Sequence, residues 1–110
     1  MTPYEKLVAA RELISDPSHW TQGCFARNKL GLTTDVKSAD ATCWCSVGAL
    51  RKVSDDIWLT PAYDLLCAVL EPEERFYEYG LIAEFNDTYT HAEVLELFDE
   101  AIALAQEHKI

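Results

Sequence analysis

Four cysteines are the residues best suited to bind a metal ion or to act as nucleophiles, and two of them are close together in the sequence. On a helix, Cys43 and Cys45 would point about 200° apart, so one ion could not take both thiolates unless the helix broke. No Cys-x-x-Cys or His-x-x-x-His pair accompanies them, although zinc sites usually contain one. We therefore favour packing over metal or redox chemistry, and we predict no metal and no cofactor.

Catalysis by a thiol needs an imidazole within hydrogen-bond reach. We expect His19 in a loop, His91 in the first turn of a helix and His108 in a frayed C-terminal tail. Pairing of His19 with Cys24 or Cys43 is conceivable, but nothing nearby in the sequence supports it. The sequence also has no Gly-rich phosphate loop, no nucleophile elbow and no metalloprotease motif. We predict no catalytic residue and favour a protein that is not an enzyme.

The block Asn86-Asp87-Thr88 carries the most polar chemistry of the chain. Such side chains often bond to nearby backbone, so we favour a turn in which Asn86 ends one helix and Asp87 leads into the next. In the alternative, Asp87 faces Arg27 or Arg51 at the mouth of a groove. A small-ligand or enzymatic site would then lie between Trp20, Arg27, Cys43 and Asp87, and the residues of this groove would be Trp20, Gln22, Arg27, Cys43, Asn86 and Asp87.

These side chains would be positioned around one apolar stretch, residues 41–50, which contains no charged residue. A helix that is apolar on all sides is a buried helix, and ten residues are too few to cross a bilayer, which needs about 20. We therefore predict a buried central helix over residues 40–53. Gly48 in its middle indicates close approach by another backbone or a large ring, with Trp44 and Trp20 as candidates.

Helix-start signals and apolar spacing predict the other elements. Thr2 and Glu5 are placed for a capping box, as are Thr90 and Glu93. Residues 24–27 and 32–36 predict a short hairpin with Gly31 at positive φ. Further helices are expected after Thr2, after Thr60-Pro61, after Glu71-Pro72 and after Thr90. The stripes expected to be buried are Tyr4, Leu7, Val8, Ala10 and Ile14, then Ala62, Leu65, Leu66, Val69 and Leu70, then Phe76, Tyr79, Ile82 and Ala83, and finally Val94, Leu97, Phe98, Ala101, Leu104 and Ala105.

The predicted fold is therefore mainly α: a compact bundle of about five helices around the buried central helix, with one small β-hairpin. At 110 residues, we expect one domain that covers the whole chain, residues 1–110. Charged residues interrupt the apolar positions near the start, so we predict no signal peptide and a cytoplasmic protein with reduced cysteines.

The net charge of −10 is unevenly distributed along the chain. Residues 1–70 hold eight acids and seven bases, whereas residues 71–110 hold eleven acids and two bases. This imbalance argues against nucleic acid or an anionic membrane as a direct partner. We predict a binding or regulatory protein whose acidic C-terminal third docks on a basic protein surface. The acidic ridge would consist of Glu74, Glu78, Glu84, Glu93, Glu96, Asp99 and Glu100. The alternative is an acidic surface that only aids solubility.

Three sequence blocks also resemble a known family. They are Trp20-Thr21-Gln22-Gly23, then Cys43-x-Cys45-x-x-Gly48-Ala49-Leu50, then Phe85-Asn86-Asp87 followed by Thr90 and Glu93-Val94. The pattern is similar to a family of small bacterial and phage proteins catalogued as a domain of unknown function, and the similarity covers nearly the whole chain. The family often has Trp where this chain has Phe85, and the resemblance implies no activity. It implies a phage or mobile-element setting, in which the basic surface could belong to a nucleic-acid-binding host protein and this chain could be an inhibitor or DNA mimic.

Overall fold

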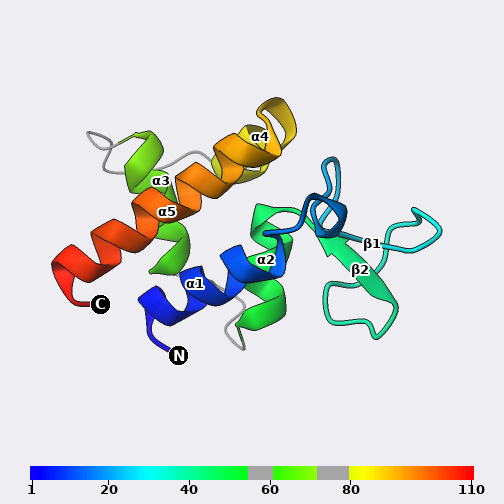
Figure 1. Cartoon of the computed structure of the whole chain (residues 1–110), viewed down its shortest axis with the longest axis horizontal. Coiled ribbons are helices and arrows are strands. Elements are labelled where there is room, and N and C mark those ends of the chain that lie inside the picture. Colours follow the sequence, from blue (N-terminus) through cyan, green and yellow to red (C-terminus); the bar gives the residue numbers. More distant parts are fainter. Residues whose placement is uncertain (55–60, 72–79) are drawn as a thin grey trace.

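A computed structural model describes residues 1–54, 61–71 and 80–110 of the chain. This part contains five α-helices, a 3-10 turn and a two-stranded antiparallel sheet, which confirms the predicted mainly α fold with a small hairpin. Figure 1 shows how these elements are arranged. The helices are α1 (Pro3–Leu13), α2 (Ser46–Val53), α3 (Ala62–Leu70), α4 (Leu81–Thr88) and α5 (His91–His108), the 3-10 turn is η1 (Pro17–His19), and the strands are β1 (Ala26–Asn28) and β2 (Ala41–Trp44).

Both predicted capping boxes form. The Thr2 hydroxyl accepts from the Glu5 N–H at 3.1 Å, and the Glu5 carboxylate accepts from the Thr2 N–H at 2.9 Å. Thr90 and Glu93 repeat this arrangement at the start of α5. Each cap stabilises its helix by about 1 kcal/mol, because it satisfies backbone donors that the helix leaves open. The two boxes therefore set where α1 and α5 begin.

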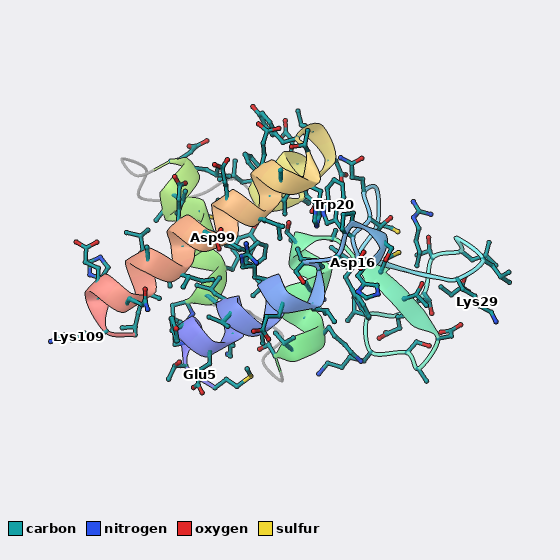
Figure 2. All side chains as sticks on the ribbon, in the orientation of Figure 1. Glu5, Asp16, Trp20, Lys29, Asp99 and Lys109 are labelled. Carbon is teal, nitrogen blue, oxygen red and sulfur yellow. The ribbon has the colours of Figure 1, made fainter. Side chains whose placement is uncertain are left out.

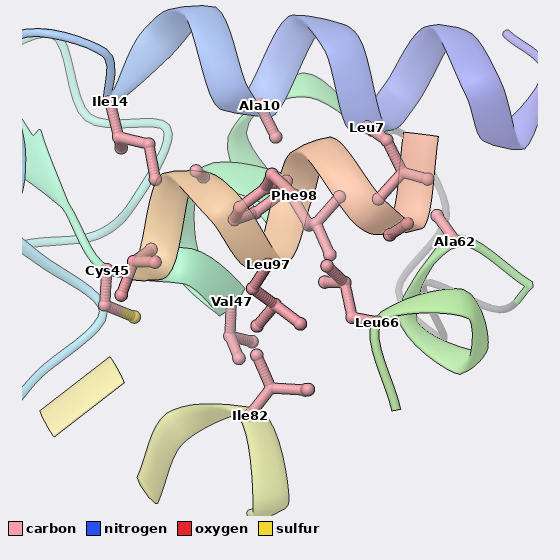
Figure 3. Packing of buried hydrophobic residues seen from close by; sticks show 14 of the residues in the cluster. Leu7, Ala10, Ile14, Cys45, Val47, Ala62, Leu66, Ile82, Leu97 and Phe98 are labelled. Atoms are coloured by element: carbon pink, nitrogen blue, oxygen red, sulfur yellow. The ribbon is translucent and has the colours of Figure 1, made fainter. Parts of the chain in front are cut away.

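Helix α5 packs against both α1 and α3 (Figure 1). Its inward face buries Val94, Leu97, Phe98, Ala101 and Ala105, as predicted, whereas Leu104 is only partly buried. Figure 3 shows Phe98 and Leu97 surrounded by side chains from the other helices, with Leu7 and Ala10 from α1, Val47 from α2, Leu66 from α3 and Ile82 from α4. The core therefore draws on α5 as well as on residues 44–50.

The predicted central helix over residues 40–53 is wrong in its first half. Residues Ala41–Trp44 form β2, Cys45 is extended at φ −81° and ψ 178°, and α2 begins only at Ser46. The Cys45 Sγ caps α2 by accepting from the Gly48 N–H at 3.3 Å. A short apolar run fits a buried strand as well as a buried helix, and β-branched and aromatic residues such as Thr42 and Trp44 favour the strand. Burial itself was predicted correctly for residues 46–50, all of which are buried.

The predicted hairpin is right in its first strand and wrong in its second. β1 pairs antiparallel with β2, so that Ala26 faces Trp44 and Arg27 faces Cys43. The segment 32–36 contributes a single bridge, between Thr33 and Arg27. Gly31 does adopt the expected positive φ of 80°. β1 pairs with the more distant segment, β2, and not with residues 32–36. The reason is that β2 leads directly into the buried helix α2, which holds β2 beside β1.

The close approach at Gly48 comes from backbone and not from an aromatic ring. A Cβ atom at this position would overlap the carbonyl oxygen of Phe25, next to the N-terminus of β1. Phe25 O also accepts from the Cys45 N–H at 3.1 Å. The expectation of a close backbone contact is thus confirmed, and the candidates Trp44 and Trp20 were wrong. The absence of a side chain at Gly48 therefore lets the backbone next to β1 pack directly against α2.

The predicted break at Asn86 and Asp87 is also misplaced. Both residues lie in the last turn of α4, which continues to Thr88 and is followed by Tyr89 at φ −108° and ψ 171°. The helix begins after Gly80, which has a φ of 88°. Asn86 and Asp87 can stand in this helical turn because their side chains bond to groups outside α4. The predicted positions Thr60, Phe76 and Tyr79 lie outside the described residues. Within the described residues, no helix combines the length and apolar character needed to cross a membrane.

Candidate functional site

Five of the six groove residues come together through direct hydrogen bonds. Trp20, which is labelled in Figure 2, and Gln22 lie on the loop after η1. Both donate hydrogen bonds to Asn86, which lies beside Asp87 in the last turn of α4. Arg27 Nη2 donates to Gln22 O, and the sixth residue, Cys43, faces Arg27 across the sheet. The sequence thus placed the right residues in one neighbourhood. What these side chains do there depends on which of their polar atoms are already bonded within the protein.

Asn86 is fully buried and all its polar side-chain atoms are bonded. Its Oδ1 accepts from Trp20 Nε1 at 2.8 Å, from the Ser46 N–H at 2.9 Å and from Ser46 Oγ at 2.7 Å. Its Nδ2 donates to Thr21 O at 3.0 Å and to Asp87 Oδ1 at 3.3 Å. One amide therefore ties the loop, the start of α2 and α4 together. We call Trp20, Thr21, Gln22, Ser46 and Asn86 the Asn86 network.

Gln22 and Asp87 attach the same loop to the exposed end of α4. Gln22 Nε2 donates to the carbonyl oxygens of Asn86 at 3.0 Å and Tyr89 at 3.2 Å. The last carbonyls of a helix lack partners within it, so Gln22 acts as a side-chain cap. Asp87 Oδ1 accepts from the Gly23 N–H at 2.9 Å, where Gly23 has a φ of 86°. Both side chains therefore hold backbone in place.

Arg27 is also engaged within the protein. Its Nε donates to Thr21 Oγ1 at 3.0 Å, its Nη1 to Gly31 O at 3.0 Å and its Nη2 to Gln22 O at 3.2 Å. Asp87 forms no ion pair with Arg27 or Arg51 in the part of the chain that the structure describes. The Arg51 guanidinium instead lies 5.0 Å from the centre of the Phe25 ring. The alternative in which Asp87 pairs with an arginine does not form here, and Asp87 instead accepts from the Gly23 N–H.

The thiols sit in environments that suit packing. Cys43 is half-buried and its Sγ lies 3.9 Å from Arg27 O. Burial raises the pKa of the Cys45 thiol and raises that of Cys67 to about 11. A thiol that keeps its proton is a poor nucleophile and a poor metal ligand. Among residues 1–54, 61–71 and 80–110, no group of three or more His, Cys, Asp or Glu side chains could hold a metal ion.

Two contributors escaped the sequence analysis. Ser46 gives two hydrogen bonds to Asn86, and the signal was its position as a polar residue within an apolar run. His91 Nε2 lies 2.6 Å from Ile14 O, which requires a proton on that nitrogen, and its ring packs 5.4 Å from the ring of Trp20. His91 thus links α5 to the end of α1. Nothing in the sequence pattern connects positions 14 and 91.

The acidic ridge is described at five of its seven positions, because Glu74 and Glu78 lie outside the described residues. Glu84, Glu93, Glu96, Asp99 and Glu100 are all exposed. Asp99 is bonded within the molecule, since its carboxylate accepts from Arg11 Nε at 2.5 Å and from Arg11 Nη2 at 3.2 Å. The outward spacing of 3, 4 and 7 places one line of carboxylates along α5. This acidic stripe consists of Glu93, Glu96, Glu100 and Glu107, the last of which was not predicted.

A comparison with protein families bears on the three sequence blocks. One family model matches residues 1–104 of the chain. The chain belongs to DUF6197, a family of unknown function. This confirms the predicted resemblance to a domain of unknown function. Comparisons of this DUF6197 protein with curated proteins and with solved structures gave no match.

The blocks that carried the resemblance meet in space in this DUF6197 protein. The first supplies Trp20, Thr21 and Gln22, the second adjoins Ser46, and the third supplies Asn86. Every buried side-chain nitrogen or oxygen in the described residues has a hydrogen-bond partner. Residues from all three blocks therefore help to hold the loop, α2 and α4 together.

Proposed function

We propose that this protein is a non-enzymatic binding or regulatory protein that docks the acidic stripe of α5 on a basic surface of another protein. The observation that carries the proposal is the stripe itself, four exposed glutamates on one helix face. The only ion pair within the described residues is between Arg11 and Asp99, so the glutamates of the stripe have no basic partner there. Aligned carboxylates of this kind attract a basic surface and speed its association.

The alternative, a ligand site at the groove residues, is less well supported. Catalytic and binding groups need free polar atoms directed at a ligand. Instead, Asn86 is fully buried, and the side chains of Gln22 and Arg27 each bond to two or more groups of the protein. These bonds give the groove residues a structural role, which leaves the acidic stripe as the surface available to a partner.

The partner class we propose is a nucleic-acid-binding protein. Such proteins bind phosphates through surfaces rich in Lys and Arg, and a row of carboxylates on a helix presents a comparable line of negative charge. In a bacterial or phage cytoplasm, this chain would then act as an inhibitor that occupies the nucleic-acid site of its partner. The proposal rests on the sign and alignment of the exposed charges.

The test compares two double charge reversals that change the net charge equally. Glu96→Lys with Glu100→Lys alters the stripe, whereas Glu12→Lys with Glu71→Lys alters exposed glutamates on other elements. Partners captured by the parent protein are identified by mass spectrometry, and the affinity of each purified partner is measured for all three proteins. We expect the stripe variant to bind at least about tenfold more weakly and the control to bind nearly as the parent does.

Salt provides the second readout. Binding through exposed charges should weaken as the salt concentration rises from about 50 mM to about 300 mM, because the Debye length shortens. Circular dichroism spectra and thermal melts of each variant establish that it is folded. A folded stripe variant that binds as tightly as the parent would remove the acidic stripe from the mechanism. Equal losses in both variants would mean that net charge, rather than the stripe, governs binding.

A further inference from the structure

We draw no further inference here: the strongest candidate, the surface patch of Leu30 and Leu32 on the turn that follows β1, is exposed and apolar, and nothing in the part of the chain that the structure describes shows what covers it.

Discussion

At the scale of single residues, Asn86 shows how much one buried amide can organise. Its Oδ1 receives donors from Trp20 and from both the backbone and the hydroxyl of Ser46. A buried donor that loses its acceptor costs about 1 to 3 kcal/mol, because water cannot replace the missing bond. Several donors depend on this one side chain. The sequence showed a polar residue suited to a turn, but no local pattern reports that it will be buried.

Replacement of Asn86 should therefore be costly. We predict that Asn86→Ala lowers the free energy of unfolding by about 3 kcal/mol or more, since it leaves the Trp20 and Ser46 donors without their acceptor. The comparison is Gln22→Ala, which removes an exposed cap and should cost only about 1 kcal/mol. Urea denaturation of the three proteins measures both values. Equal losses would contradict the central role given to Asn86.

Cys67 provides a pH test at the same scale. Burial raises the pKa of its thiol from 9.0 to about 11. The unfolded chain therefore loses this proton at lower pH than the folded chain, and the associated stability is fully present below pH 9.0 and lost as the pH rises towards about 11. We predict that the free energy of unfolding of the parent falls more steeply across this window than that of Cys67→Ala. Urea denaturation series at several pH values give the two slopes, and equal slopes would contradict the assignment.

At the scale of the elements, the helix ends were more predictable than the sheet. The capping boxes at Thr2 and Thr90 depend on residues three positions apart, so the sequence pattern contains all the atoms involved. The pairing of β1 with β2 instead joins residues about 15 apart across an intervening loop, and the competing segment 32–36 was nearer in sequence. The Asn86 network was anticipated as a neighbourhood of residues but not as a set of bonds, because its partners come from three different elements.

The distance in sequence between contacting residues also explains why a helix was wrongly predicted at residues 41–45. An uncharged apolar run indicates burial, and burial is what residues 44–50 show. Whether such a run is a strand or a helix depends on which elements lie beside it. Here Phe25 accepts from the Cys45 N–H and packs on Gly48, so β1 imposes an extended backbone up to Cys45. This constraint on the backbone arises only in the assembled fold, so it cannot be predicted from the sequence of residues 41–45 alone.

At the scale of the whole molecule, acidic and basic residues are concentrated in different parts of the fold. Residues 80–110 hold seven acids and one base, whereas residues 20–54 hold two acids and five bases. The carboxylates that cluster on α4 and α5 repel one another. Such self-repulsion destabilises the folded state and is screened by salt. A surface kept acidic at the expense of stability is consistent with a role in binding.

We therefore predict that the melting temperature rises by several degrees when NaCl is raised from about 10 mM to about 500 mM, because screening relieves this repulsion. Glu96→Lys with Glu100→Lys changes the net charge from −10 to −6, since each substitution replaces a negative charge by a positive one. The rise should be smaller in this variant. Thermal melts at the two salt concentrations measure it, and a parent that is insensitive to salt would contradict the prediction.

The Asn86 network also bears on how the chain folds. Asn86 bonds to Ser46, 40 residues away, and to Trp20, 66 residues away. Contacts that span so much chain form only after the intervening segments have collapsed, since closing long loops costs entropy first. The helices α1 and α5 can begin from their own caps, but the side chains of Trp20 and Gln22 gain their hydrogen-bond partners only when α4 is in place. We expect this loop to settle in the last step of folding, with the indole of Trp20 as its natural fluorescent reporter.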